Sequence, residues 1–187
     1  MDWTFEYPLR TERLDLRPHR LDDLDDLVVF HSDPEVTRYI PWPARTRQQT
    51  LDALRVKLDR IVARAPGDWI VLAIEERATG TVIGEVLIKR EADGQAEVGY
   101  VIRADRQGQG LATEAVVGIL DAASERFGVT TVDAVVEPPN TASARLLTRL
   151  GFIEHARERQ GDVKLIRFRR AHRIDSGSNS RADTTSK

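Results

Sequence analysis

The hydrophobic residues in the first third of the chain change from alternating to helical spacing. Leucines alternate with charged residues over Arg10–Pro18, which predicts a strand with one face in water. Apolar residues then recur every three or four positions from Leu21 to Val29 and again from Thr46 to Ala65, which predicts two helices. The first helix begins with four acidic residues, which we expect to form a solvated helix start: Asp22, Asp23, Asp25 and Asp26.

The rest of the chain carries β-branched runs that indicate strands, interrupted by two helical patterns. Trp69–Glu75 and Thr81–Lys89 flank a short turn and predict a hairpin, and Ala96–Ile102 predicts a third consecutive strand. The remaining predicted elements are a helix over Leu111–Phe127, a strand over Thr130–Val136, a helix over Asn140–Leu150, and two strands that flank residues 160–162 and end near Arg170.

The order of these elements predicts one domain over residues 1–173. Its fold class is α/β (α+β), with a mixed sheet of about seven strands and about four helices. From Asp175 onward the chain lacks large apolar residues, so residues 174–187 are predicted to form a disordered polar tail.

The composition excludes several classes of protein. The chain has 187 residues, with 28 Lys and Arg against 30 Asp and Glu, and no cysteine. The missing thiol excludes disulfides, thiolate metal sites and cysteine nucleophiles. Because the charge is balanced, a nucleic-acid partner is not expected. No uncharged apolar run approaches the roughly 20 residues that cross a bilayer, and no secretion signal is visible, so we expect a cytoplasmic protein without a membrane partner.

A glycine-containing turn is the most informative feature of the sequence. Within Tyr100–Glu114 a strand gives way to a helix through Gln107, Gly108, Gln109 and Gly110. Such a turn places backbone N–H groups at a helix N-terminus, where the dipole favours an anion, so a phosphate site and a plain loop are the two interpretations. A P-loop needs Lys-Ser/Thr after its last glycine, and a Rossmann fingerprint needs a third glycine or alanine where this chain has threonine. Neither motif fits.

Several motifs resemble those of the GNAT superfamily of acyl-CoA-dependent N-acetyltransferases. DRQGQG at residues 105–110 resembles the family's Gln/Arg-x-x-Gly-x-Gly/Ala turn, with Asp105 in place of the first residue, as in many members of the RimJ/RimL branch. LRTERLDLRPHRLDDL near the N-terminus, the strand AEVGYVI and the helix NTASARLLTRLGF also resemble that branch, so the resemblance covers roughly residues 8–170. It implies a mostly antiparallel GNAT-like sheet that binds acetyl-CoA as co-substrate and needs no metal.

The resemblance also implies where acetyl-CoA binds. Turn amides would hold the pyrophosphate, and the backbone of the preceding strand would pair with pantetheine. The implied cofactor-binding residues are Tyr100, Ile102, Gln107, Gly108, Gln109, Gly110, Leu111, Ala112 and Asn140. The tyrosine that most members place beside the leaving thiolate is replaced by Leu147, so we expect Ser143 to hydrogen-bond the sulfur, unless it is a small residue needed for close packing. Asn140 is expected to cap the helix and to contact pantetheine or acceptor.

Acetyl transfer from a thioester to an amine needs no covalent enzyme intermediate, so a chain without cysteine can perform it by direct attack. The attacking amine must be unprotonated, which is easier for a peptide α-amine with a pKa of about 7.7–8 than for a lysine amine at about 10.4. We expect Glu97 to act as the base through a water, with a structural role as the alternative. Glu137 is the second candidate base.

The acceptor side is less clearly marked. Tyr39 and Trp42 lie in a loop that lines the acceptor side in the resembling family, although simple hydrophobic packing is the alternative. The histidines are separated in sequence and are expected at the surface: His19, His31, His155 and His172. A basic run from Arg157 to Arg173 is expected to be the wet face of a hairpin, or else a ribosome or RNA contact.

The sequence therefore predicts an acetyl-CoA-dependent N-acetyltransferase that acts on a protein N-terminus or a small amine. Its predicted partners are acetyl-CoA, the amine and, as an open possibility, a second copy in a homodimer. The alternative is a non-catalytic acyl-CoA-binding or ribosome/RNA-associated module with the same fold.

Overall fold

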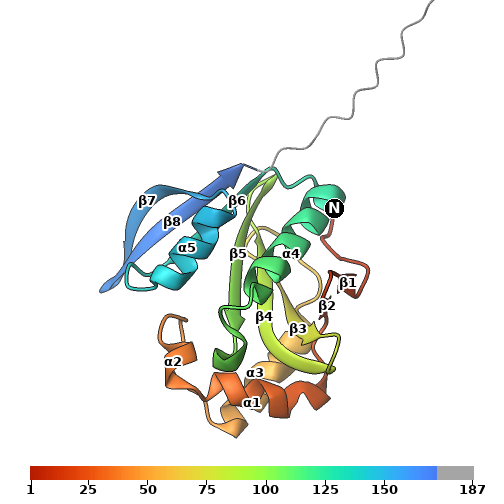
Figure 1. Ribbon diagram of the computed structural model, residues 1–187. Helices are drawn as coiled ribbons and strands as arrows, with labels where there is room; N and C mark the ends of the chain where they lie inside the picture. The colour runs from red at the N-terminus through yellow and green to blue at the C-terminus, as the bar shows by residue number, and fades with distance from the viewer. Residues whose placement is uncertain (172–187) are drawn as a thin grey trace, which may run out of the picture.

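An eight-stranded mixed sheet forms the centre of the computed structural model, which describes residues 1–171 (Figure 1). The strand order is β1-β2-β3-β4-β5-β6-β8-β7, and in this described part of the chain only β5 and β6 are parallel neighbours. The strands are β1 Leu9–Arg10, β2 Leu14–Arg17, β3 Trp69–Glu76, β4 Thr81–Arg90, β5 Gln95–Ile102, β6 Thr131–Val136, β7 Ile153–Gln160 and β8 Val163–Ala171. The predicted tail at residues 174–187 lies outside the described residues.

Helices cover both faces of this sheet. The α-helices of residues 1–171 are α1 Leu24–His31, α2 Pro34–Thr37, α3 Arg47–Leu58, α4 Leu111–Phe127 and α5 Thr141–Arg149, and the 3-10 helices are η1 Leu21–Asp23 and η2 Ala104–Arg106. Both α4 and α5 lie against the face that is turned to the viewer in Figure 1. The opposite face packs against α1 and α3. The predicted GNAT-like mixed fold is confirmed, with eight strands and five α-helices among the described residues.

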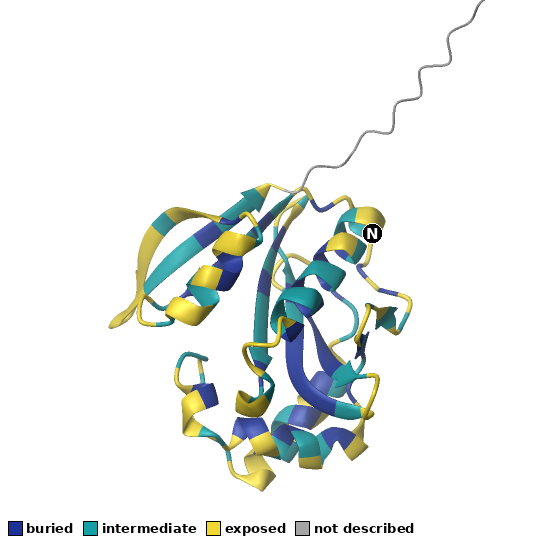
Figure 2. Ribbon diagram, viewed as in Figure 1, coloured by how far each residue is buried: buried dark blue, intermediate teal, exposed yellow. Residues whose placement is uncertain are grey.

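Two hydrophobic clusters fill the two sides of the sheet. The larger cluster joins the strands to α4, whose apolar residues recur at helical spacing and are buried: Leu111, Ala115, Val116, Ile119, Leu120 and Ala123. The smaller cluster joins Leu27 and Phe30 of α1 and Leu54 of α3 to Ala73 and Val82 of the sheet. Figure 2 shows buried strands in the middle of the sheet, a largely exposed β7 and a mostly half-buried β8.

Strands β5 and β6 are neighbours over a short length only. They pair in parallel from Gln95–Thr131 to Glu97–Asp133, which is three residue pairs. Strand β5 continues to Ile102 and stays paired with β4 on its other side throughout. The two strands therefore separate after Glu97, along the part of β5 that leads to the glycine turn.

The structure corrects two predicted boundaries near the N-terminus. The single strand predicted over Arg10–Pro18 is a pair, β1 and β2, which raises the number of strands to eight. The second long helix, α3, ends at Leu58 and not at Ala65, because Ala63 forms a backbone bridge with Trp3. Apolar periodicity alone does not reveal that long-range bridge.

Candidate active site

The turn between β5 and α4 presents backbone amides with no partner in the described chain. Gly108 and Gly110 have φ angles of 75° and 79°, in the left-handed region that side chains rarely adopt. Gly110 is the N-cap of α4, and no side chain caps this helix. Within residues 1–171, the N–H groups of residues 108–112 make no hydrogen bond to a backbone acceptor. A Cβ added at Gly108 would meet no atom within 4 Å, so the space in front of the turn is open.

An arginine from β2's N-terminal side braces this turn, and sequence reasoning missed it. Arg13 Nη1 donates to the Gln109 carbonyl at 3.1 Å, and Arg13 Nε pairs with Glu114 Oε2 at 2.7 Å. Burial opposes ionisation of Glu114, but hydrogen bonds from Thr11 and Arg13 outweigh it and lower the Glu114 pKa. The ion pair fixes the Arg13 guanidinium against the Gln109 carbonyl, and the Glu114 carboxylate balances its charge.

The acidic residue at the start of the turn is neutralised by its neighbours. Asp105 accepts hydrogen bonds from Arg103 Nε at 2.7 Å and from Arg106 Nη1 at 3.5 Å. The hydrogen bond from Arg103 lowers the pKa of Asp105. The departure from the family's Gln/Arg at this position therefore adds no uncompensated negative charge beside the candidate phosphate site.

The open edge of β5 presents main-chain groups toward the gap beside β6. Arg103 N donates to Ile83 O of β4 at 2.9 Å, and main-chain groups alternate in direction along a strand. Those of Tyr100 and Ile102 therefore point away from β4. Gln107 Nε2 already donates to the Ile102 carbonyl at 3.0 Å, which leaves the Ile102 N–H and both Tyr100 groups for a ligand.

The start of α5 lies beside this edge. Asn140 Oδ1 accepts a hydrogen bond from Ser143 N at 3.2 Å, so Asn140 is the N-cap of α5. Burial raises the pKa of the Tyr100 phenol, and the nearby Ser143 offsets part of that rise. Within the described residues the phenol oxygen has no hydrogen-bond partner at normal hydrogen-bond geometry. Leu147, where most family members place a tyrosine, is fully buried in the core. The structure thus brings Tyr100, Asn140 and Ser143 together.

Glu97 lies on the opposite face of the sheet from Tyr100. Side chains alternate between the two faces along a strand, and these two residues are three positions apart. Its Oε2 accepts a hydrogen bond from Arg167 Nη1 at 3.1 Å. Arg167 also pairs with Glu158 at 2.7 Å and lies 3.4 Å from Asp133, so it holds Glu97 within an ionic network. The structure does not bring Glu97 next to Ser143. Glu97 lies in the last β5–β6 residue pair on one face of the sheet, and α5, which carries Ser143, packs against the other face. The second candidate base, Glu137, follows the end of β6.

A buried charged cluster under α1 and α3 was not predicted. Glu85 of β4 is 2% exposed and ion-pairs with Lys57. Its carboxylate oxygens also lie 3.1 Å from His19 Nε2 and 3.2 Å from His31 Nε2. Burial opposes ionisation of Glu85, but Lys57 and the two histidines lower its pKa well below the usual value. The prediction of surface histidines is therefore wrong for His19 and His31, both of which are buried; His155 is exposed, and His172 lies outside the described residues.

The cluster continues to the aspartates at the start of the first helix. Arg17 Nη2 pairs with Asp23 Oδ1 at 2.7 Å and with Glu75 Oε2 at 2.6 Å. Asp23 is 4% exposed, so the predicted solvated helix start is wrong at this position. Burial opposes ionisation of Asp23, but His19, whose Nδ1 lies 3.7 Å from Oδ2, and the hydrogen bonds from Arg17 lower the Asp23 pKa far below the usual value.

The loop between α2 and α3 lies over one end of this cluster. Trp42 contacts His31 with ring centroids 6.4 Å apart, and the Arg45 guanidinium carbon lies 4.4 Å from the Trp42 ring centroid. Arg45 N donates to the His31 carbonyl at 2.8 Å. Tyr39 is half-buried in the same loop, beside Arg38. The predicted acceptor residues are thus placed on the face of the sheet that also carries Glu97.

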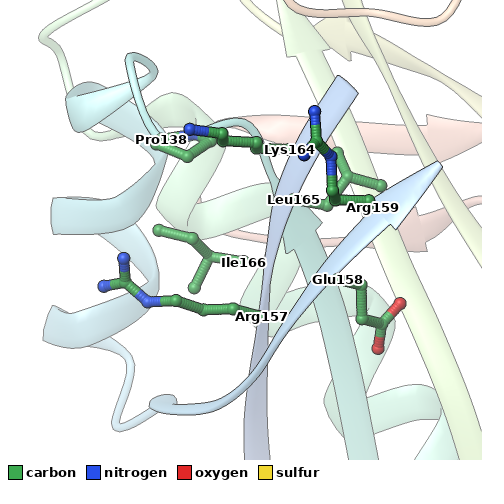
Figure 3. A pocket seen from close by; sticks show the side chains of 7 residues that line it. All are labelled: Pro138, Arg157, Glu158, Arg159, Lys164, Leu165 and Ile166. Carbon is green, nitrogen blue, oxygen red and sulfur yellow. The ribbon is translucent and has the colours of Figure 1, made fainter. Parts of the chain in front are cut away.

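The β7–β8 hairpin carries a shallow pocket of about 220 Å³ that contains none of the predicted site residues (Figure 3). It is lined by Pro138, Arg157, Glu158, Arg159, Lys164, Leu165 and Ile166. In Figure 3 the side chain of Ile166 lies between those of Lys164 and Arg157. The basic run from Arg157 forms the solvent-exposed face of the hairpin only in part, because Arg167 and Arg169 pair with acidic residues.

Two further observations concern residues 1–171 alone. No group of three or more His, Cys, Asp or Glu side chains is arranged to hold a metal ion in this part of the chain. No helix within it has the length and apolarity needed to cross a membrane.

Comparison with known proteins supports the resemblance found in the sequence. Residues 13–153 match the acetyltransferase (GNAT) domain. The uncharacterized N-acetyltransferase p20 of Bacillus licheniformis is 34% identical over 145 residues, which are 77% of this chain and 81% of p20. A putative ribosomal-protein-serine acetyltransferase from Vibrio cholerae has a TM-score of 0.77 at 23% identity, covering 90% of this chain and 99% of its own. RimL, a ribosomal-protein acetyltransferase solved with coenzyme A, has a TM-score of 0.74 at 14% identity, and the match covers 89% of this chain and 98% of RimL.

Fold and sequence together define the class: the protein is an acetyltransferase. The chain belongs to the GNAT family, whose members use acetyl-CoA. The predicted enzyme class and co-substrate are thereby confirmed at the level of the family, and the likeness to RimL shows a shared fold. The roles of individual residues stay predictions.

Proposed function

We propose that the protein transfers an acetyl group from acetyl-CoA to a primary amine by direct attack in a ternary complex. One arrangement carries the proposal: the open edge of β5 runs directly into a glycine turn whose amides have no partner in the described chain. Pantetheine would extend the sheet along β5, and the pyrophosphate would accept hydrogen bonds from the turn. RimL, which has this fold, was solved with coenzyme A.

On the α4–α5 face, the chain's own groups would hold and activate the thioester. Gly108, Gly110 and the first amides of α4 would bind phosphate oxygens, with Arg13 fixed against the Gln109 carbonyl. Tyr100 and the Ile102 N–H would pair with pantetheine amides. Ser143 would donate a hydrogen bond to the sulfur as negative charge develops there, because a hydroxyl is too weak an acid to protonate it outright.

On the other face, the amine would approach the same gap from the side of the α2–α3 loop. Glu97 would take the amine proton through a water while Arg167 holds the carboxylate in place. Glu137 is the second candidate for this role. The ion pair with Arg167 also suits a purely structural glutamate, so turnover of Glu97→Gln measured against pH separates the two roles.

We propose a protein N-terminal α-amine or a small-molecule amine as the acceptor. The names of the Vibrio cholerae protein and of RimL, which both refer to ribosomal proteins, support the first of these. A homodimer and a cytoplasmic location are further proposals from the sequence.

Release of free thiol from acetyl-CoA, measured with a panel of amines, tests the proposed function. We expect thiol release that depends on both protein and amine, with acetylated amine formed in equal amount. The competing possibility, a non-catalytic acyl-CoA-binding module, predicts thermal stabilisation by acetyl-CoA without amine-dependent thiol release. That second result would refute the proposed catalysis.

A further inference from the structure

Arg13 connects the glycine turn to the segment before β2, which is distant from the turn in sequence. Its Nη1 donates to the Gln109 carbonyl at 3.1 Å, across 96 positions of the chain. A Cβ added at Gly110 would lie 3.6 Å from Arg13 Nη2, so the guanidinium packs directly against the turn. Arg13 therefore contacts both residues that immediately precede α4.

The Arg13 guanidinium is itself held in place by Glu114 in the first turn of α4. Both carboxylate oxygens accept hydrogen bonds: Oε2 from Arg13 Nε at 2.7 Å, and Oε1 from Arg13 N at 2.7 Å and Thr11 Oγ1 at 2.5 Å. Burial opposes ionisation of Glu114, but these hydrogen bonds lower its pKa, so the carboxylate is charged at neutral pH. An ionised carboxylate bound at both oxygens leaves Arg13 little freedom to turn away from Gln109.

The hydrogen bond to the Gln109 carbonyl also fixes the direction of the next amide. The Gln109–Gly110 peptide is trans and planar, so its carbonyl and the Gly110 N–H point in opposite directions. Because the carbonyl points at Arg13, the N–H points away from Arg13. Within residues 1–171 the Gly110 N–H makes no hydrogen bond to a backbone acceptor. Glycine alone does not hold this direction, because its backbone adopts a wide range of φ angles.

We propose that Arg13 is a positioning residue for the co-substrate. It holds the Gln109–Gly110 peptide in the orientation in which the Gly110 N–H donates to a pyrophosphate oxygen. Arg13 acts through the carbonyl of Gln109 and not by touching phosphate, and Glu114 acts through Arg13. The inference rests on the proposed function, in which the glycine turn binds the pyrophosphate, and it extends that site to a side chain from the N-terminal segment.

An arginine at this place is also compatible with a purely structural role, and Arg77 is the control for that role. Arg77 Nη1 donates to the carbonyls of Thr11 at 3.3 Å and Glu12 at 3.2 Å, so it braces the same segment as Arg13. Within residues 1–171 none of its hydrogen bonds goes to the glycine turn. The exposed fractions of the Arg13 and Arg77 side chains are 45% and 46%, so methionine substitutions at the two positions are well matched.

Titration calorimetry with coenzyme A and with dephospho-coenzyme A tests the inference. Both ligands contain the pyrophosphate, and only coenzyme A carries the 3′-phosphate. We expect Arg13→Met to raise the Kd of both ligands roughly 10-fold, which corresponds to about one hydrogen bond. Arg77→Met should leave both Kd values unchanged. A rise of equal size in the two arginine variants would show a structural role, and a rise for coenzyme A alone would show a contact with the 3′-phosphate; either result overturns the inference.

Glu114→Ala separates positioning from direct attraction between Arg13 and phosphate, because the two accounts predict opposite effects. Removal of the carboxylate leaves the Arg13 charge unbalanced beside the turn, so direct attraction predicts a lower Kd for coenzyme A. Positioning predicts a higher Kd, because nothing then holds Arg13 against the Gln109 carbonyl. This comparison still decides if Arg13→Met fails to fold.

The outcomes that overturn the inference are therefore distinct from failure of the proposed function. An unchanged Kd in folded Arg13→Met, or a Kd for Glu114→Ala that does not rise, overturns the positioning role while the wild-type protein still binds coenzyme A. A wild-type protein that binds neither ligand overturns the proposed function and, with it, the inference.

Discussion

Replacing Gly108 with alanine should remove most of the thermal stabilisation that acetyl-CoA gives. The residue has a φ of +75°, and an added Cβ would meet no protein atom within 4 Å. The methyl group therefore costs the free protein only backbone strain, about 1–2 kcal/mol for a left-handed residue. In a domain of this size 1 kcal/mol corresponds to about 2–4 °C, so the melting temperature without ligand should fall by about 2–8 °C.

The substitution should also weaken acetyl-CoA binding, and this effect is separate from the backbone strain. At a concentration 100 times its Kd, acetyl-CoA stabilises the wild-type protein by about 2.7 kcal/mol, or about 5–11 °C. A methyl group in the phosphate position would remove a charge-assisted hydrogen bond of about 1.5–3 kcal/mol. At the same acetyl-CoA concentration the stabilisation should then fall to about 0.3–1.3 kcal/mol.

Melting curves of both proteins with increasing acetyl-CoA give this difference. Gly128→Ala is the control, because Gly128 has a φ of +65°, an open Cβ position and a place at the opposite end of α4, about 25 Å away. It should lower the melting temperature without changing the acetyl-CoA shift. A folded Gly108→Ala protein with the full wild-type shift would refute the assignment of the turn to the pyrophosphate.

Two further predictions concern the ionised groups. Glu97→Gln should lower turnover roughly 100-fold near pH 7 and leave acetyl-CoA affinity nearly unchanged. The loss of turnover should shrink toward pH 9, because more of the amine is already neutral there. Full activity of the variant at pH 7 would exclude Glu97 as the base. Asp23→Asn should lower the free energy of unfolding by about 3 kcal/mol at pH 7, because it leaves Arg17 buried with one partner fewer. Since the Asp23 pKa is lowered on folding, the contribution of Asp23 to the free energy of unfolding is complete above about pH 4 and is lost as the pH falls below that. Denaturant titrations should therefore show that the stability of the variant falls less steeply with acid than that of the wild-type protein. An equally steep fall would count against this account.

The regular elements and the glycine turn could be predicted because their signals are local. The helix predicted over Leu111–Phe127 has the observed bounds of α4, and the predicted strands from Trp69 to Ile102 differ from β3, β4 and β5 by a residue or two at most. In each case the period of the apolar positions matched the element, and Gly or Pro residues marked its ends. The positive φ of Gly108 and Gly110 likewise follows from a turn that only glycine adopts easily.

The charged cluster could not be predicted, because its members come from distant parts of the chain. Glu85 is 66 residues from His19, 54 from His31 and 28 from Lys57. Each of these residue types is common at surfaces, and only the folded sheet shows that they meet beneath α1 and α3. A partial signal existed: Glu85 stands within the apolar run of β4, where a lone carboxylate needs a buried partner.

The short contact between β5 and β6 divides the sheet into two unequal parts. Strands β1 to β5 form one antiparallel run, and β6, β8 and β7 form another. Within residues 1–171, three residue pairs of the sheet connect the two runs. The second part therefore depends on α4 and α5 packing to keep its position. A molecule that pairs with β5 and also touches α5 would act as a clamp across this junction. Besides supplying the acetyl group, the bound co-substrate would then fix the position of α5, which carries Ser143, relative to β5, which carries Glu97.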